Sequence, residues 1–440
     1  MGGSSFTAGE ESVTLDFANA EITKNDESIE LSDLAEGDIL TVEVGSNNTA
    51  ASATVESVGG GQSFGGSGEV TQGAAATTIS EDGTYSGESY TSTGDDENAL
   101  RVDGAAVTLD GVTVDKSAGA ASNTEDGDFY GMNAALLAMD GATVTIKNAT
   151  VTSSAQNGNG VFSYGSGTTS ASNLVVETSG NSSAAIRSDR GGGTVNVSGG
   201  AYTSNGYNSP AVYSTADITV KNANLTANNS EALVIEGKNS ITLEDCYATG
   251  NMSDTKGTSS SENVHNVMIY QSMSGDADVG TSVFSMTGGS LVGSSGDMFY
   301  IMNTRCLLTL SGVNIVNNDA DGALLRVVGN SASRGWGTAG SNGAQVEFAA
   351  DGQTLAGDII VDTISNLTMT MKNGSTFTGT INIIDNAEGG TAVSDNAVVA
   401  IENGCTWNLT GNCTLTSLTN NGTINFNGYI ITLADGTVLK

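Results

Sequence analysis

The chain has 440 residues, of which 59 are Gly and 1 is Pro, and its 14 Lys and Arg stand against 49 Asp and Glu, for a formal net charge of −35. This balance excludes a protein that grips nucleic acid through its phosphates, because that requires clustered Lys and Arg, and it disfavours binding to anionic membrane surfaces. Only 14% of the residues are charged and 38% are hydrophobic, so the chain can bury a core.

Residues 1–58 carry three short strand-like runs, VTLDF from Val13, SIELS from Ser28 and DILTVEV from Asp38, which predict a small separate β module. Residues 59–75 begin with GGGQSFGGSGE, a composition typical of a flexible linker. No basic segment followed by an apolar one opens the chain, and no apolar run approaches the 18 or so residues of a membrane span. We therefore expect no membrane insertion.

An eleven-residue pattern recurs from residue 107 onward. Its copies begin at Val107, Val144, Thr169, Val195, Ile218, Ile241, Phe284 and Leu308. Most copies start 23 to 26 residues after the previous one, with two longer spacings of 37 and 43. The first and third positions are mostly apolar with a polar residue between them, which is the alternation of a strand with one exposed face.

Two positions of this repeat are predicted to form columns in the core. The third position holds Leu109, Ile146, Ala171, Val197, Val220, Leu243, Met286 and Leu310. The eighth holds Val114, Val151, Val176, Tyr202, Leu225, Ala248, Leu291 and Ile315. The eleventh position holds Ser117, Ser154, Ser179, Asn205, Asn228, Asn251, Ser294 and Asn318. Because Asn and Ser bond turn backbone and Asn tolerates left-handed φ/ψ, we expect a ladder along one corner there.

A third apolar stretch precedes each copy, such as ALLAM from Ala135 and ALVIE from Ala232. Three strands per turn of 23 to 26 residues predict an all-β fold, a right-handed parallel β-helix over residues 76–344. A sandwich would show two-residue hairpin turns throughout, and a propeller would repeat every 40 to 50 residues or so. In residues 345–440 the spacing changes and Asn-Gly steps recur, which predicts irregular C-terminal coils and a cap.

Four segments carry a resemblance to known proteins: YSGESYTSTGDDENALRVDGA from Tyr85, SPAVYSTADITVKNA from Ser209, SEALVIEGKN from Ser230 and SLTNNGTINFNG from Ser417. From about Ala76 to Lys440 the chain resembles the large right-handed β-helix proteins of gut-dwelling Clostridia. These have the pectin-lyase-like architecture and are described as adhesin-like or carbohydrate-binding surface proteins. The resemblance implies an extracellular, cell-surface location, and we expect the chain to be an excised part of an exported protein.

The pectin-lyase-like fold hosts lyases, hydrolases, adhesins and structural spikes alike, so chemistry must be sought in the residues. The single histidine, His265, has no accompanying GxSxG elbow or reactive Cys signature, and neither HExxH nor a Cys/His cluster occurs. We therefore predict no catalytic residue and a structural or exposed His265. The four cysteines are too scattered for a disulfide scaffold and are expected to be buried, reduced thiols.

Acidic pairs occur in predicted loops, at Asp126 with Asp128 and at Asp276 with Asp278. Carboxylates two residues apart can coordinate Ca²⁺, although the EF-hand loop and the RTX repeat are both missing. We expect solvated loop charge and no cofactor, with these two pairs as the places where calcium would bind.

A column in the third strand carries the main candidate binding site. Aligning the third stretches places eight residues at equivalent, outward positions: Arg101, Ala138, Ser163, Arg187, Tyr213, Val234, Tyr270 and Arg326. Tyr rings stack on sugars and Arg donates to hydroxyls or carboxylates, so the Arg and Tyr members form a stripe suited to a glycan or an extended peptide. Alternatively, these long side chains cover neighbouring strands. Trp336, in SRGWGTAGSNG, is a second candidate sugar platform.

Three classes of function follow. The preferred one is a non-catalytic, adhesin-like surface protein whose partner is a glycan or a host or cell-surface protein. The first alternative is a polysaccharide lyase or hydrolase, which requires carboxylates about 5–9 Å apart in a groove. The second alternative is a purely structural spacer. An ice-binding Thr array is disfavoured because the Thr columns are interrupted, and the oligomeric state is left open.

Overall fold

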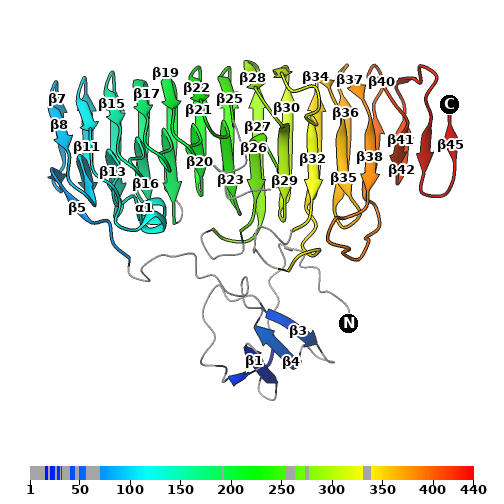
Figure 1. Cartoon of the computed structure of the whole chain (residues 1–440), viewed down its shortest axis with the longest axis horizontal. Coiled ribbons are helices and arrows are strands. Elements are labelled where there is room, and N and C mark those ends of the chain that lie inside the picture. Colours follow the sequence, from blue (N-terminus) through cyan, green and yellow to red (C-terminus); the bar gives the residue numbers. More distant parts are fainter. Residues whose placement is uncertain are drawn as a thin grey trace.

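Stacked coils of parallel strands form most of the chain. The computed structural model describes residues 15–17, 20–24, 27–29, 31, 40–44, 49–55, 70–190, 193–252, 263–272, 277–330 and 338–440. Each coil contributes up to three short strands, and the coils lie side by side along the long axis from the blue to the red end (Figure 1). Every pairing in the two largest sheets joins parallel strands, so the predicted parallel β-helix is confirmed.

The third strands of the coils form a twelve-stranded sheet. In order, its strands are β6 (Thr78–Ile79), β10 (Leu100–Asp103), β13 (Leu136–Met139), β16 (Val161–Tyr164), β18 (Ile186–Asp189), β20 (Val212–Ser214), β23 (Leu233–Glu236), β26 (His265–Tyr270), β29 (Asp297–Met302), β32 (Leu325–Val328), β35 (Ile359–Asp362) and β38 (Ile381–Ile384).

The first and second strands belong to a twenty-stranded sheet. The first strands are β7 (Gly83–Ser86), β11 (Ala106–Asp110), β14 (Thr143–Lys147), β21 (Asp217–Lys221), β24 (Ser240–Glu244), β27 (Thr281–Thr287), β30 (Arg305–Ser311), β33 (Gln345–Asp351), β36 (Asn366–Lys372), β39 (Ala397–Ile401) and β42 (Ser417–Asn420). The second strands are β8 (Ser89–Ser92), β12 (Thr113–Lys116), β15 (Thr150–Ser153), β22 (Asn224–Ala227), β25 (Tyr247–Gly250), β28 (Ser290–Gly293) and β31 (Asn314–Asn317). Two long strands, β17 (Thr168–Thr178) and β19 (Thr194–Ser204), span both positions.

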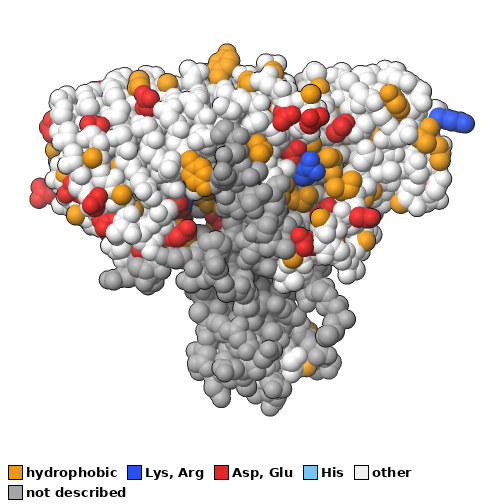
Figure 2. All heavy atoms as spheres, viewed as in Figure 1, with side chains coloured by type: hydrophobic (Ala, Val, Ile, Leu, Met, Phe, Trp, Pro, Cys, Tyr) orange, Lys and Arg blue, Asp and Glu red, His pale blue; other side chains and the backbone are white. Residues whose placement is uncertain are grey.

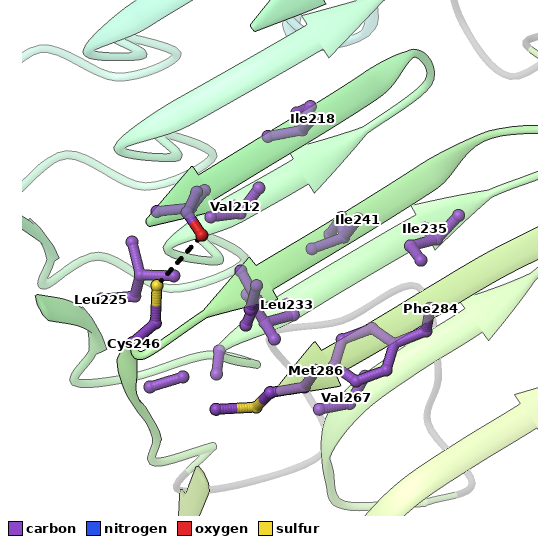
Figure 3. Close-up of a cluster of buried hydrophobic side chains, with 14 of the residues drawn as sticks. Val212, Ile218, Leu225, Leu233, Ile235, Ile241, Cys246, Val267, Phe284 and Met286 are labelled. Atoms are coloured by element: carbon purple, nitrogen blue, oxygen red, sulfur yellow. Dashed lines mark hydrogen bonds between the residues drawn. The ribbon is translucent and has the colours of Figure 1, made fainter. Parts of the chain in front are cut away.

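The predicted core columns stack in register. Leu109 pairs with Ile146, and Val197 pairs with Val220. The other members of the third-position column pair likewise from coil to coil, and all of them are buried. The eighth-position column is also continuous, although Ile315 at its end is only half-buried. Figure 3 shows part of this interior, where the Cys246 thiol donates to the Val220 carbonyl oxygen at 3.2 Å.

The left-handed turn residues lie at the fifth position of the repeat, not at the eleventh. The fifth position has φ between 50° and 69° in all eight copies, at Gly111, Asn148, Asn173, Gly199, Asn222, Asp245, Gly288 and Gly312. These residues make the tight corner between first and second strands, which only Gly and short polar residues occupy without strain. The expected ladder at the eleventh position does occur, since Asn228 Nδ2 donates to Asn205 Oδ1 at 2.7 Å, but its backbone is not left-handed.

The C-terminal coils are more regular than predicted. The core column runs on from Leu310 through Ala350 and Met371 to Ile401. The second strands form a separate four-stranded sheet of β34 (Thr354–Ala356), β37 (Thr376–Gly379), β40 (Thr406–Leu409) and β43 (Thr423–Asn425). The last sheet contains β41 (Cys413–Leu415), β44 (Ile431–Leu433) and β45 (Val438–Leu439), and the antiparallel pairing of β45 with β44 closes the series.

The N-terminal module contains a mixed four-stranded sheet of β1 (Glu21–Lys24), β2 (Glu27–Ile29), β3 (Leu40–Val44) and β4 (Ala50–Val55), in the order β2-β1-β4-β3. Its core includes Ile22 and Ala53. The predicted linker lies mostly outside the described residues, but its last two residues are β5 (Ala74–Ala75), which pairs with β9 (Glu97–Asn98) and so begins the first coil. No helix in the described part of the chain is long and apolar enough to span a bilayer.

Candidate functional site

The predicted Arg/Tyr stripe lies on the outer face of the twelve-stranded sheet, but its alignment needs correction. The register places Arg101, Leu137, Phe162, Arg187, Tyr213, Val234, Met268, Tyr300 and Arg326 in one column. Ala138 and Ser163 are one residue out of step and lie on the opposite side of their strands. Tyr270 is two residues out of step, pairing with Glu236, and Met268 takes its place on β26.

The Arg101 side chain makes hydrogen bonds within the first coil. Its guanidinium donates to the carbonyl oxygens of Gln72 at 2.7 Å and Ala74 at 2.8 Å, and its Nε donates to Asn98 Oδ1 at 3.0 Å. Partial burial lowers the pKa of Arg101. These bonds tie the segment before β5 to β10, so Arg101 organises the first coil.

Arg187 is the centre of a buried ion network. Its NH2 donates to Asp189 Oδ2 at 2.8 Å, and its NH1 lies 3.6 Å from Asp128 Oδ1. Its guanidinium carbon also lies 4.1 Å from the centroid of the Tyr213 ring. Burial lowers the pKa of Arg187, but the two carboxylates raise it by more, so the net shift is upward. The Arg187 guanidinium, held between Asp128 and Asp189, therefore stays positively charged.

Two of the predicted ligand-binding tyrosines meet on one buried carboxylate. Tyr213 and Tyr270 both donate a hydroxyl hydrogen bond to Glu236 Oε2, Tyr270 at 3.2 Å, and their hydroxyl oxygens lie 3.0 Å apart. Ser272 donates to the other oxygen, Glu236 Oε1. Burial, with the negative charge of Glu236, raises the pKa of Tyr213 well above its usual range. Sequence reasoning missed Glu236, since a charged residue at a strand end gives no periodic signal.

A short helix is fixed to the same face. It is α1 (Thr124–Tyr130), begun by the Asn123 side chain, which accepts from the Asp126 main-chain N at 3.1 Å. Asp128 on this helix accepts from Asn157 Nδ2 at 3.0 Å and pairs with Arg187. Asp126 and Asp128 are therefore helical and buried, which contradicts the expectation of solvated loop charge.

His265, the first residue of β26, belongs to a second buried polar cluster. Its Nε2 lies 3.1 Å from Glu231 Oε1 and its Nδ1 lies 3.2 Å from Asn263 Oδ1. Both ring nitrogens thus have a side-chain oxygen within hydrogen-bonding distance. The imidazole also stacks on Tyr300, with centroids 5.1 Å apart. Burial raises the pKa of Glu231, but hydrogen bonding and charge from His265 outweigh this, so its pKa is lowered.

Arg326, the last stripe residue, completes this second cluster. Its Nε donates to Asp297 Oδ2 at 2.6 Å, and Asn263 Nδ2 donates to the same oxygen at 2.8 Å. The main-chain N of Ala323 donates to Asp297 Oδ1 at 2.8 Å. The side chains from Glu231 through His265 and Asn263 to Arg326 therefore form one connected chain of polar contacts across β26, β29 and β32.

The remaining predicted site residues divide as follows. Asp278 is exposed, whereas Asp276 and Trp336 lie outside the described residues. Among residues 70–440, apart from the gaps given above, no three His, Cys, Asp or Glu side chains gather as a metal site would require. All four cysteines are buried with free thiols, as expected, and burial raises the pKa of Cys413 to about 11.

The outer face of the twenty-stranded sheet is different in kind. The second position of the repeat stacks as an uninterrupted column of hydroxyl and amide side chains, each exposed or half-buried: Thr84, Thr108, Thr145, Ser170, Asn196, Thr219, Thr242, Ser285 and Thr309. Nearby, Tyr247 on β25 is 60% exposed. On the face shown in Figure 2, most of the surface is uncharged and acidic side chains are scattered over the coils.

Comparison of the chain with family models, with curated proteins and with solved structures gives no match.

Proposed function

We propose that the chain is a non-catalytic, extracellular surface protein, whose β-helix binds a glycan or a protein of another surface along the outer face of the twenty-stranded sheet. The observation that carries the proposal is the second-position column of Thr, Ser and Asn, continuous over nine coils and open to solvent. At about 4.8 Å per coil, such a column offers evenly spaced donors and acceptors to an extended ligand.

The buried clusters of the twelve-stranded sheet support a non-catalytic role. Arg187 neutralises Asp189, Arg326 neutralises Asp297, and His265 pairs with Glu231. The hydroxyl groups of Tyr213 and Tyr270 donate hydrogen bonds to Glu236. Groups committed in this way stabilise the fold, which favours the alternative that the stripe covers its own strands.

A glycan array probed with the whole chain tests the proposal. We expect specific hits that disappear when two column members are replaced by Lys, as in T219K/T242K, because the added side chains block approach to the column. The matched control is T226K/T249K, whose Thr pair stacks on the second strands of the same two coils. Hits lost in the control but kept in T219K/T242K would move the site to the second strands, and a silent array together with no adhesion to cells would leave a spacer.

One observation favours a polysaccharide-degrading enzyme as the second candidate. Four carboxylates, Asp189, Glu231, Glu236 and Asp297, lie on one sheet together with His265. Asp189 and Glu236 end their strands β18 and β23, which are separated in the sheet by β20, and glycosidases place two carboxyl groups on one surface. Release of reducing ends or unsaturated products from a polysaccharide panel, abolished in Glu236→Gln, would establish this function; no product from any substrate would eliminate it.

A further inference from the structure

One corner between the twelve-stranded and twenty-stranded sheets concentrates buried oxygen atoms without hydrogen-bond partners. The side-chain oxygens of Asn303, Asn330 and Asn342 have no partner, and neither does Asn330 Nδ2. Asn330 is fully buried, and Asn303 and Asn342 are 6% and 7% exposed. Leaving a buried amide group without a partner is unfavourable, because the group has lost its hydrogen bonds to water. Such groups clustered at one corner therefore point to a ligand.

The three asparagines lie on adjoining coils. Asn303 N donates to Val328 O at 3.3 Å, just before Gly329 and Asn330, and Asn330 N donates to Ser341 O at 2.9 Å, next to Asn342. All three residues follow the third strands, β29 and β32, where the chain turns toward the next first strand. The corner is thus a single place in the fold, bounded by main-chain hydrogen bonds.

A buried carboxylate lies at the same corner, on the following coil. Asp362 is 2% exposed, and its Oδ2 accepts from Gly329 N at 2.9 Å, one residue before Asn330. It also accepts from Asn386 Nδ2 at 2.7 Å and from Ile364 N at 3.2 Å. Among the ion pairs of the described residues, none involves Asp362, in contrast to Asp189 and Asp297. Within the described residues, its partners are therefore hydrogen-bond donors of the main chain and of Asn386.

We propose that this corner binds a calcium ion, with the side-chain oxygens of Asn303, Asn330 and Asn342 and the carboxylate of Asp362 as protein ligands. Three side-chain oxygens there lack a partner against one side-chain nitrogen, and the Asp362 carboxylate adds two further oxygens. That balance suits a hard cation, which takes six to eight oxygens or so from carboxylates, amides, main-chain carbonyls and water. Ordered water is the competing occupant.

The site differs from the acidic pairs that the sequence indicated, because most of its ligands are uncharged amides. A single carboxylate predicts weak binding, with a Kd on the order of 10⁻⁴–10⁻³ M, as in extracellular calcium modules. Binding would fix three successive coils at this corner, whatever ligand the exposed column takes. The inference therefore stands or falls independently of the proposed function.

Calcium binding to the whole chain, stripped with EDTA, is measured by equilibrium dialysis and by thermal unfolding with and without CaCl₂. We expect one weakly bound ion per chain and a higher Tm with calcium. Asp362→Asn should abolish both, whereas Asp358→Asn, an exposed carboxylate of the same coil, should leave both unchanged. Binding that survives Asp362→Asn but is lost in Asp126→Asn or Asp278→Asn would overturn the assignment.

A gain-of-function variant guards against a misfolded Asp362→Asn protein. Asn330→Asp adds a second carboxylate at nearly unchanged volume, and we expect it to tighten calcium binding by about tenfold, because affinity rises with ligand charge. It should lower Tm in EDTA and recover stability in calcium. If Asn330→Asp lowers Tm equally in both conditions, or if no variant binds calcium, the corner holds only water and the proposal fails.

Discussion

The twelve-stranded and twenty-stranded sheets enclose the same interior, yet their outer faces are built on different principles. Outside the twelve-stranded sheet, charged and aromatic side chains are buried and paired with one another, as Arg187 is with Asp189 and His265 with Glu231. Outside the twenty-stranded sheet, ion pairs such as Lys221–Glu244 are about half exposed and the dominant column is uncharged.

This difference separates residues that hold the fold from residues that are free to meet a partner. Removing one member of a buried ion pair leaves an uncompensated charge, whereas exposed pairs contribute little. Residue types that look like binding groups in the sequence, Arg and Tyr, are those committed to the structure. The plain Thr and Ser residues are the ones available to a ligand.

The largest expected effect comes from breaking the Arg187 network. Arg187→Met removes the guanidinium that pairs with the buried Asp128 and Asp189, and we expect a loss of about 3–5 kcal/mol in the free energy of unfolding. Urea unfolding of the whole chain measures this. Lys221→Met, which breaks the exposed pair with Glu244, is the matched control and should leave the unfolding midpoint unchanged; equal losses in the two variants would contradict the contrast between the faces.

A smaller loss is expected where the two sheets share the interior. Ile146→Ala removes a fully buried side chain from the core column, and such truncations cost about 2–5 kcal/mol. Thr145→Ala, at the exposed position just before it, should change the unfolding free energy by less than about 0.5 kcal/mol. A comparable loss of unfolding free energy from both substitutions would mean that Thr145, like Ile146, faces the core.

The interior was predictable because the first and second strands alternate strictly. A polar residue between Val107 and Leu109 leaves no doubt about which side faces inward, and each later copy repeats the choice. In the third strands both sides are buried, so the alternation disappears, as in Leu136–Met139. Ala138 was consequently assigned to the outer face, which Leu137 in fact occupies.

Register errors of two residues were invisible for another reason. A strand shifted by two keeps each side chain on its own face. Tyr270 was therefore placed outward correctly but in the wrong column, and its partner Glu236 went unnoticed. The buried clusters depend on which residues the corners of variable length bring together, which no local pattern encodes. The proposed calcium site likewise depends on unpaired atoms that belong to separate coils, which no local sequence pattern brings together.

Turn chemistry offers a finer test of the regular sheet. Gly312 occupies the fifth position with φ of 61°, and a Cβ there would touch nothing within 4 Å. The cost of Gly312→Ala is therefore the backbone strain alone, about 1–2 kcal/mol. Gly312→Asn should cost less, because Asn fills the same position in Asn148 and Asn222. Thermal unfolding ranks the three proteins, and an Ala variant as stable as Asn would refute the role assigned to this column.

The smallest expected effect depends on pH and on the second buried cluster. The folded pKa of Glu231 lies below its ordinary value of 4.5. Its stabilisation is therefore fully present above that value and is lost as the pH falls through the folded pKa, because the unfolded chain takes up the proton first. Glu231→Gln removes this contribution, so its Tm should lie below that of the parent protein at pH 7. The difference in Tm between the two proteins should narrow as the pH falls below 4.5. If the difference in Tm between Glu231→Gln and the parent protein stayed constant over the acid range, the prediction would be wrong. Glu231 would then support the fold by its shape and hydrogen bonds, and the negative charge that it places beside His265 would contribute nothing.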